Sequence, residues 1–121
     1  MKYVFLSRDP EVLAAREGAF WPGDEVVTVD TWQQALDACD GAEMVFVDMI
    51  ATLKEKGKLA GYEEFAEAKM AHSVASKTPL VLIAPPDDYE MEGMVGYPDF
   101  VFAHVRRPVT FKTLRRMTTL V

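Results

Sequence analysis

The sequence predicts an α/β domain in which five parallel strands alternate with helices. Three observations lead to this prediction: short, wholly apolar runs recur along the chain, amphipathic segments separate them, and several runs end in a polar residue. Apolar runs without alternation are typical of strands buried on both faces. Repeated strand–helix units place such strands parallel, with right-handed crossovers. We expect the 121 residues to form one domain, 1–121.

The expected strands are the apolar runs themselves. They cover residues 3–6, 25–29, 44–47, 79–84 and 100–105. The run 44–47 is the most informative, because Asp48 follows it directly. A carboxylate at the end of a buried strand needs a partner, and this edge of a parallel sheet is where ligand sites lie. A doubly wound, flavodoxin-like sheet fits the alternation best.

Cap residues mark the expected starts of the first two helices. Asp9 is a natural N-cap before the first helix. Phe20 and Trp21, which follow that helix, are expected to pack onto the sheet. Either Asp30 or Thr31 caps the second helix. Its expected inner face consists of Trp32, Ala35, Leu36 and Cys39.

Two further helices are expected in the second half of the chain. Helical spacing places Tyr62, Phe65, Ala66 and Met70 on the inner face of the third helix. Lys69 is expected on its solvent side. Thr110 caps the last helix, which is expected to turn Phe111, Leu114 and Met117 inward and Lys112, Arg115 and Arg116 outward. The segment 87–98 is expected to be a loop with at most a short helix.

Composition excludes several classes of function. The net charge of −6 argues against a nucleic-acid partner. Apolar runs are too short to span a bilayer, and we expect neither a secretory leader nor a membrane partner. The single Cys39 excludes an internal disulfide and is expected in the core. His72 and His104 lack metal-ligand spacing with it. We therefore expect a cytoplasmic protein without metal or cofactor.

In their order, these elements resemble the receiver domain of response regulators, the CheY-like phosphoacceptor module of two-component signal transduction. The resemblance covers essentially the whole chain and implies a (βα)5 fold. It places Asp48, after the run 44–47, at the phosphoacceptor position. Arg107-Pro108 stands where the family has Lys-Pro, and His104 stands where the family often has a switch aromatic residue.

The departures from the family pattern are more informative than the matches. Ser7 and Arg8 replace two acidic residues, Ala84 replaces Thr or Ser, and Arg107 replaces Lys, so only Asp48 remains of the five-residue site. Phosphoryl transfer needs a divalent ion, and Mg²⁺ needs hard oxygen ligands. We therefore expect neither metal binding nor phosphorylation. We expect Arg8 to take the place of the ion and to pair with Asp48.

These departures predict a pseudo-receiver, which is not an enzyme and works by protein–protein contact without phosphorylation. Asp9 is expected to serve as a helix cap rather than as a metal ligand. The expected partner is another signalling protein or a second copy of the chain. The expected interaction face on the last strand and helix consists of Tyr97, Phe102, His104, Lys112, Arg115 and Arg116.

Two alternatives remain open at this point. The first is a conventional receiver that is phosphorylated on Asp48 through an unusual metal site. The second is a small-molecule sensor with a pocket at the strand ends, which Arg8, Asp48, His104 and Arg107 would line. A purely structural use of each of these residues is also open. The geometry around Asp48 separates these hypotheses, because Arg8 or Arg107 within hydrogen-bonding distance of Asp48 favours the pseudo-receiver, whereas an open pocket argues against it.

Overall fold

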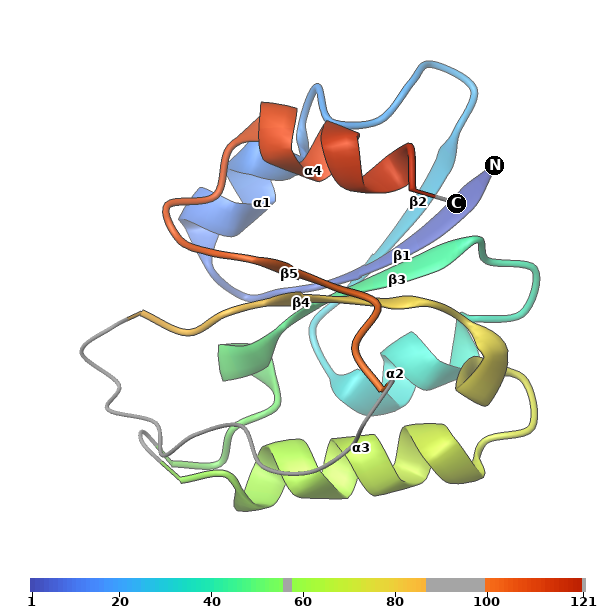
Figure 1. The fold of residues 1–121 in the computed structure, drawn as a ribbon, viewed down its shortest axis with the longest axis vertical. Coiled ribbons are helices and arrows are strands. Elements are labelled where there is room, and N and C mark those ends of the chain that lie inside the picture. Colours follow the sequence, from blue (N-terminus) through green and yellow to red (C-terminus); the bar gives the residue numbers. More distant parts are fainter. Residues whose placement is uncertain (56–57, 87–99, 121) are drawn as a thin grey trace.

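The computed structural model describes residues 1–55, 58–86 and 100–120, which contain a five-stranded parallel sheet with helices on both faces (Figure 1). The strands are β1 (Lys2–Leu6), β2 (Glu25–Val29), β3 (Met44–Asp48), β4 (Leu80–Ile83) and β5 (Ala103–Val105). Their order in the sheet is β2-β1-β3-β4-β5, so the topological switch point lies between β1 and β3. The predicted doubly wound, flavodoxin-like fold class is confirmed.

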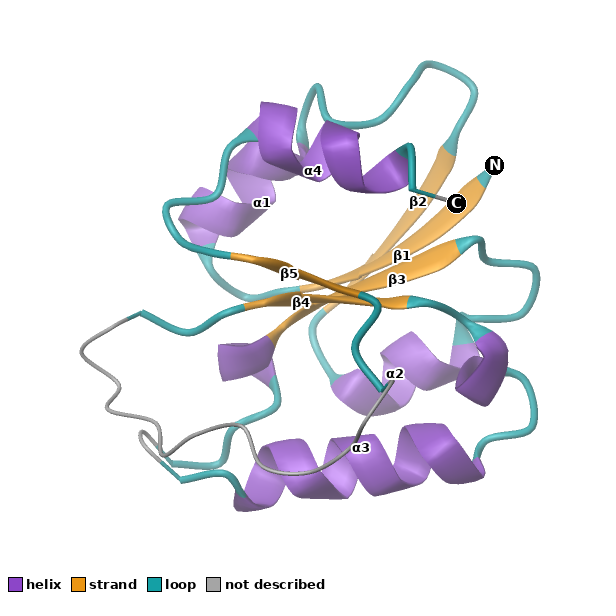
Figure 2. Ribbon diagram, in the orientation of Figure 1, coloured by secondary structure: helices purple, strands orange, loops and turns teal. Residues whose placement is uncertain are grey.

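The helices form one layer on each face of the sheet. Helices α1 (Pro10–Arg16) and α4 (Phe111–Thr118) cover one face, and α2 (Trp32–Asp37) and α3 (Ala60–Ala71) cover the other (Figures 1 and 2). Two short 3₁₀ helices follow β3 and α3, namely η1 (Met49–Ala51) and η2 (Ala75–Lys77). This arrangement buries the sheet on both sides, which explains the wholly apolar strands.

Each face of the sheet has its own apolar core, because successive side chains of a strand point to opposite faces. Leu6 and Val47 belong to the core beneath α2 and α3. Phe5, Phe46 and Val105 belong to the core beneath α1 and α4. This alternation decides where the polar residues at the strand ends point, as described below.

The cap predictions are confirmed by side-chain contacts. The Asp9 carboxylate accepts a hydrogen bond from the backbone N–H of Glu11, at 2.9 Å. Thr31, rather than Asp30, caps α2, and Thr110 caps α4. These hydroxyls accept hydrogen bonds from N–H groups that the first helical turn leaves without partners.

The last strand and the last helix differ in part from prediction. The strand begins at Ala103, not at residue 100, and the preceding Phe102 is exposed. Trp21 does not pack onto the sheet: its side chain is 59% exposed, and its ring lies 4.7 Å from the guanidinium carbon of Arg115. Arg115 also donates a hydrogen bond to the Gly18 carbonyl, so it does not extend into solvent as predicted. Phe111, predicted to face inward, is exposed.

The inner face of α3 agrees with the prediction at Tyr62, Phe65 and Ala66, which are buried, and differs only near the end of the helix. Lys69 is only 3% exposed, and Met70 is exposed instead. The Nζ atom of Lys69 donates to the carbonyl oxygen of Thr78, at 2.8 Å, and lies 5.4 Å from the centre of the Phe100 ring. Burial lowers the pKa of Lys69. A lysine can occupy a core position when its stem is packed and its ammonium group has partners.

The remaining predictions meet simple outcomes. Cys39 is 1% exposed and lies in the core, as predicted. In the described part of the chain, no helix is long and apolar enough to cross a membrane. Tyr97 and the predicted loop 87–98 lie outside the described residues.

Candidate functional site

The carboxyl edge of the sheet gathers four of the predicted site residues. Ser7 follows β1, Asp48 ends β3, Ala84 follows β4 and Arg107 follows β5. Because the strands are parallel, these ends lie along one edge. Asp48 is at the centre of the group and is completely buried.

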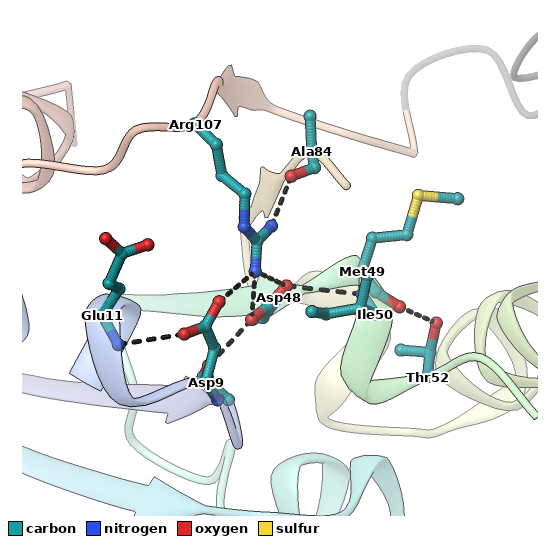
Figure 3. A network of polar contacts seen from close by, with 9 residues as sticks. Asp9, Glu11, Asp48, Met49, Ile50, Thr52, Ala84 and Arg107 are labelled. Carbon is teal, nitrogen blue, oxygen red and sulfur yellow. Dashed lines mark hydrogen bonds and ion pairs between the residues drawn. The ribbon is translucent and has the colours of Figure 1, made fainter. Parts of the chain in front are cut away.

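Arg107 makes the central contacts of the site. Its Nη2 atom lies 2.8 Å from Oδ2 and 3.0 Å from Oδ1 of Asp48, and 3.1 Å from Oδ2 of Asp9 (Figure 3). Its Nη1 atom donates to the backbone carbonyl of Ala84. One guanidinium therefore bridges two carboxylates and a carbonyl, which suits its planar set of donors. The Arg107 side chain is itself only 14% exposed.

Ser7 completes the set of donors around Asp48. Its hydroxyl donates to Oδ2 of Asp48, at 2.8 Å, and accepts a hydrogen bond from the backbone N–H of Asp9, at 3.1 Å. The backbone N–H of Ile50 donates to Oδ1 of Asp48, at 3.3 Å. Both carboxylate oxygens thus have hydrogen-bond donors inside the protein, as a buried carboxylate requires.

Burial dominates the electrostatics of Asp48. Loss of hydration raises the pKa of its carboxyl group above the ordinary value, while the charge of Arg107 and the hydrogen bonds from Ser7, Arg107 and Ile50 pull it down. The charged form is therefore expensive at this position. Its retention depends on the donors just described.

The predicted pairing of Arg8 with Asp48 is wrong, and Arg107 pairs with Asp48 instead. Arg8 is exposed, and its Nη2 atom donates to the carbonyl oxygen of Ala51, at 2.8 Å. Strand alternation explains the difference. The parallel register pairs Leu6 with Val47, so the next pair, Ser7 and Asp48, shares the face of α1 and α4. Arg8 then points toward the opposite face.

Asp9 has a second contact that sequence reasoning missed. Besides capping α1, its carboxylate pairs with Arg107, at 3.1 Å. The available signal was the position of Asp9 just beyond the end of β1, at the same edge as Asp48. An N-cap uses one carboxylate oxygen, Oδ1, and leaves the other free for a cation.

His104 lies away from this group. It occupies the middle of β5 and is exposed, and it pairs in register with Leu82, whose side chain belongs to the core beneath α2 and α3. His104 is therefore on the other face of the sheet from Asp48. Asp48 is sealed beneath Arg107, so the pocket of the sensor hypothesis, lined jointly by Arg8, Asp48, His104 and Arg107, does not form.

The residues of the site do not fit a divalent cation. Among the described residues, Arg107 contacts the carboxylates of Asp9 and Asp48, so a cationic guanidinium already occupies the space between them. Within the described residues, no group of three or more His, Cys, Asp and Glu side chains is arranged to hold a metal ion. A metal would have to displace a charge-assisted network that is already complete.

Comparison with solved structures identifies the fold. No protein-family model matches the sequence, and no characterised protein matches it in sequence. The chemotaxis response regulator CheY4 of Vibrio cholerae superposes with a TM-score of 0.68 and 16% identity, over 98% of this chain and 96% of that one. The chain has the receiver-domain fold. The predicted resemblance to receiver domains is confirmed at the level of structure.

Two further solved structures show the same likeness. One is the receiver domain of the sensor histidine kinase PA1611 from Pseudomonas aeruginosa, which holds a magnesium ion in its active-site cleft. It has a TM-score of 0.66 and 16% identity, over 98% of this chain and 94% of that one. The other is NtrX from Brucella abortus, with a TM-score of 0.67 and 17% identity. Its match covers 98% of this chain and 26% of that longer one.

Proposed function

We propose that this receiver-fold chain is a pseudo-receiver, which acts by contact with another protein and without phosphorylation of Asp48. The observation that carries the proposal is the contact of Arg107 with both carboxylate oxygens of Asp48, at 2.8 and 3.0 Å. The guanidinium of Arg107 holds the Asp48 carboxylate in its unmodified, ion-paired form. The switch of a receiver requires this carboxylate to alternate between an unmodified and a phosphorylated form.

The chemistry of phosphoryl transfer supports this proposal. A carboxylate nucleophile must reach the phosphorus atom, and here Asp48 is 0% exposed. The phosphoryl oxygens need a metal ion, and the two positions that follow β1 carry Ser7 and Arg8 instead of carboxylates. Ala84 offers no side-chain hydroxyl, and its carbonyl already accepts a hydrogen bond from Arg107.

The proposed contact surface lies along β5 and α4. Phe102 and His104 are exposed at β5, and Lys112 and Arg116 are exposed on α4. The two pairs lie on opposite faces of the sheet, so a partner would have to reach around the edge strand. Arg115 takes a smaller part than its sequence position indicates, because Trp21 and Gly18 hold it. We propose that the partner is a signalling protein or a second copy of the chain. We also propose a cytoplasmic location, because the cytoplasm keeps single thiols such as Cys39 reduced.

Incubation with Mg²⁺ and a small phosphodonor, such as acetyl phosphate, tests the absence of phosphorylation. Intact mass should show only the unmodified chain. A base-labile phosphoryl adduct that disappears in Asp48→Asn would overturn the proposal and establish a conventional receiver. A variant that restores the family pattern, with Ser7→Asp, Arg8→Asp, Ala84→Thr and Arg107→Lys, is the positive control. It should bind Mg²⁺ in a calorimetric titration.

Sedimentation across micromolar concentrations tests self-association. If a second copy is the partner, the mass should rise with concentration, and Lys112→Glu combined with Arg116→Glu should reduce the association. Phe102→Asp should do the same from the other side of the edge. A constant monomeric mass, together with unchanged capture of every partner by these variants, would exclude this surface.

A further inference from the structure

Arg8 is the arginine that does not pair with the carboxylates of the candidate site. Because Arg107, and not Arg8, pairs with Asp48 and Asp9, Arg8 has no carboxylate partner in the described part of the chain. Its one hydrogen bond there is to the carbonyl oxygen of Ala51. Arg8 follows β1, and Ala51 follows β3, so the two span the topological switch point of the sheet. In open α/β sheets, the crevice at this point is where ligands bind.

Among the residues that the structure describes, Arg8 lines three hollows, and two of them share further lining residues. The first of these two has a volume of about 310 Å³, and Arg8 lines it together with Trp32 of α2, Lys54 of the segment that precedes α3, and Glu64 of α3. The second, of about 380 Å³, lies between Arg8, Asp9 and Ile50. Ala51 and Leu53 border both. Each hollow is at the lower end of the range for small-molecule sites, and together they suit a ligand with two parts.

The charges of the first hollow favour an anion. Lys54 pairs with Glu64, at 2.8 Å, and each of these charges offsets the other. The guanidinium of Arg8 is then the excess charge among the lining residues of this hollow. Its planar fork of donors matches a phosphate or a carboxylate group.

Trp32 supplies an aromatic wall to the same hollow. Its side chain is half-buried, and its ring packs edge-on against Phe65 with 6.1 Å between ring centres. The contact with Phe65 holds the ring in place, and Trp32 is one of the residues that line the hollow. Aromatic rings of ligands pack against an indole either offset-stacked or edge-on.

Gly61 keeps the first hollow in shape. A Cβ atom at this position would lie 2.3 Å from the carbonyl oxygen of Thr52 and 3.0 Å from the backbone nitrogen of Lys54. The first turn of α3 therefore rests directly on the segment 52–54, which forms one wall of the hollow. Such a wall is formed before any ligand arrives.

We propose that this crevice binds a nucleoside monophosphate, with the phosphate on Arg8 and the base against Trp32. A nucleotide is the ligand class that joins an anion to an aromatic ring over the span of the two hollows. The proposal does not rest on the pseudo-receiver proposal, because it uses the observed pairing of Arg107 with Asp48 and makes no use of whether Asp48 is phosphorylated. Phosphorylation of Asp48 would overturn the earlier proposal and leave this one standing.

Calorimetric titration of the intact chain with AMP, GMP and CMP tests the proposal. At least one of them should bind saturably below millimolar concentration. Adenosine and inorganic phosphate, the two separate halves, should each bind more weakly than the nucleotide. Trp21→Phe leaves Trp32 as the only tryptophan, and its fluorescence should change on binding.

Arg8→Gln provides the decisive variant, because Arg8 is exposed and its loss should not disturb folding. We expect nucleotide binding to weaken at least about tenfold, as for the loss of one charge-assisted contact. Arg106→Gln, which changes an exposed arginine near the edge strand, should leave binding unchanged. Three results would overturn the proposal: no binding of any of the three nucleotides at millimolar concentration, equal binding by Arg8→Gln, or phosphate alone binding as tightly as the nucleotide.

Discussion

The guanidinium of Arg107 contacts both carboxylate oxygens of Asp48, although 59 positions separate the two residues in the chain. The contact joins the end of β5 to the end of β3 and also reaches Asp9, before α1 (Figure 3). Three separate segments therefore depend on one side chain. The network has two acids and one cation, so the cation is the member whose loss is most costly.

Arg107→Gln should destabilise the chain by about 3 kcal/mol, because it leaves a fully buried carboxylate without its cation. Urea denaturation gives the free energy of unfolding. The free energy of unfolding of Arg107→Lys should lie between those of the wild type and Arg107→Gln, since an ammonium group keeps the charge but cannot reproduce the planar set of contacts. Arg106→Gln, at the exposed neighbouring position, should change stability by less than about 0.5 kcal/mol. Equal stability of Arg107→Gln and the wild type would show that the network contributes nothing.

The raised pKa of Asp48 predicts the pH dependence of stability. The folded chain holds the Asp48 proton more tightly than the unfolded chain, whose carboxyl has the ordinary pKa of 3.8. In the window above that value, acidification therefore favours the folded state, and a rise in pH through the folded pKa removes this contribution. The free energy of unfolding of the wild type, relative to Asp48→Asn, should increase as the pH falls. The opposite slope would mean that Arg107 outweighs burial.

Ser7→Ala should cost about 1 to 2 kcal/mol. The hydroxyl donates to Asp48 and accepts from the backbone N–H of Asp9, and its removal leaves both buried groups with one partner fewer. Chemical denaturation measures the loss. Ser73→Ala, on an exposed turn, is the matched control and should be neutral. A neutral Ser7→Ala would indicate that Arg107 alone satisfies the carboxylate.

Lys69→Ala should destabilise the chain by about 2 kcal/mol, although Lys69 is a charged residue on a surface helix. The change removes a buried stem and leaves the carbonyl of Thr78 without its donor. Lys77→Ala, which changes an exposed lysine nearby, should have almost no effect. Similar values for the two variants would place Lys69 in solvent, as the sequence pattern predicted.

Gly61→Ala should destabilise the chain by about 2 kcal/mol, because a Cβ atom would press on the backbone at Thr52. The sign is diagnostic, since Gly→Ala inside a helix ordinarily stabilises it. The segment 52–54 would have to move, so nucleotide binding at Arg8 should weaken as well. Gly23→Ala controls for destabilisation alone: the φ of +101° at Gly23 strains an alanine, but Gly23 lines neither hollow, so nucleotide binding should be unchanged. A stabilising Gly61→Ala would contradict the close approach.

Much of the fold follows from local patterns in the sequence, namely apolar runs and N-cap residues. Four-residue apolar runs such as 44–47 can be satisfied only between two layers, and the N-cap residues Asp9, Thr31 and Thr110 set the helix starts. The position of Asp48 at the end of a strand could be predicted from the apolar run 44–47 alone.

The end of α3 shows where a prediction from residue type is wrong, because Lys69 is buried there and Met70 is exposed. The spacing from Tyr62 through Phe65 points equally well to position 69 or 70, and apolar character favoured Met70. The structure buries Lys69, because the Thr78 carbonyl and the Phe100 ring lie where its ammonium group ends. These partners come from segments beyond α3, so the pattern within the helix could not reveal them.

The sequence by itself determined the elements, their order and the carboxylate at the end of β3, since each depends on neighbours along the chain. Tertiary structure decided which arginine pairs with Asp48. Register places Ser7 beside Asp48 and turns Arg8 to the opposite face, while Arg107 reaches Asp48 from the end of β5. The physical reason is the alternation of side chains across a sheet. Adjacent residues at the end of β1 therefore have different environments: Ser7 lies beside the buried Asp48, whereas Arg8 is exposed on the opposite face.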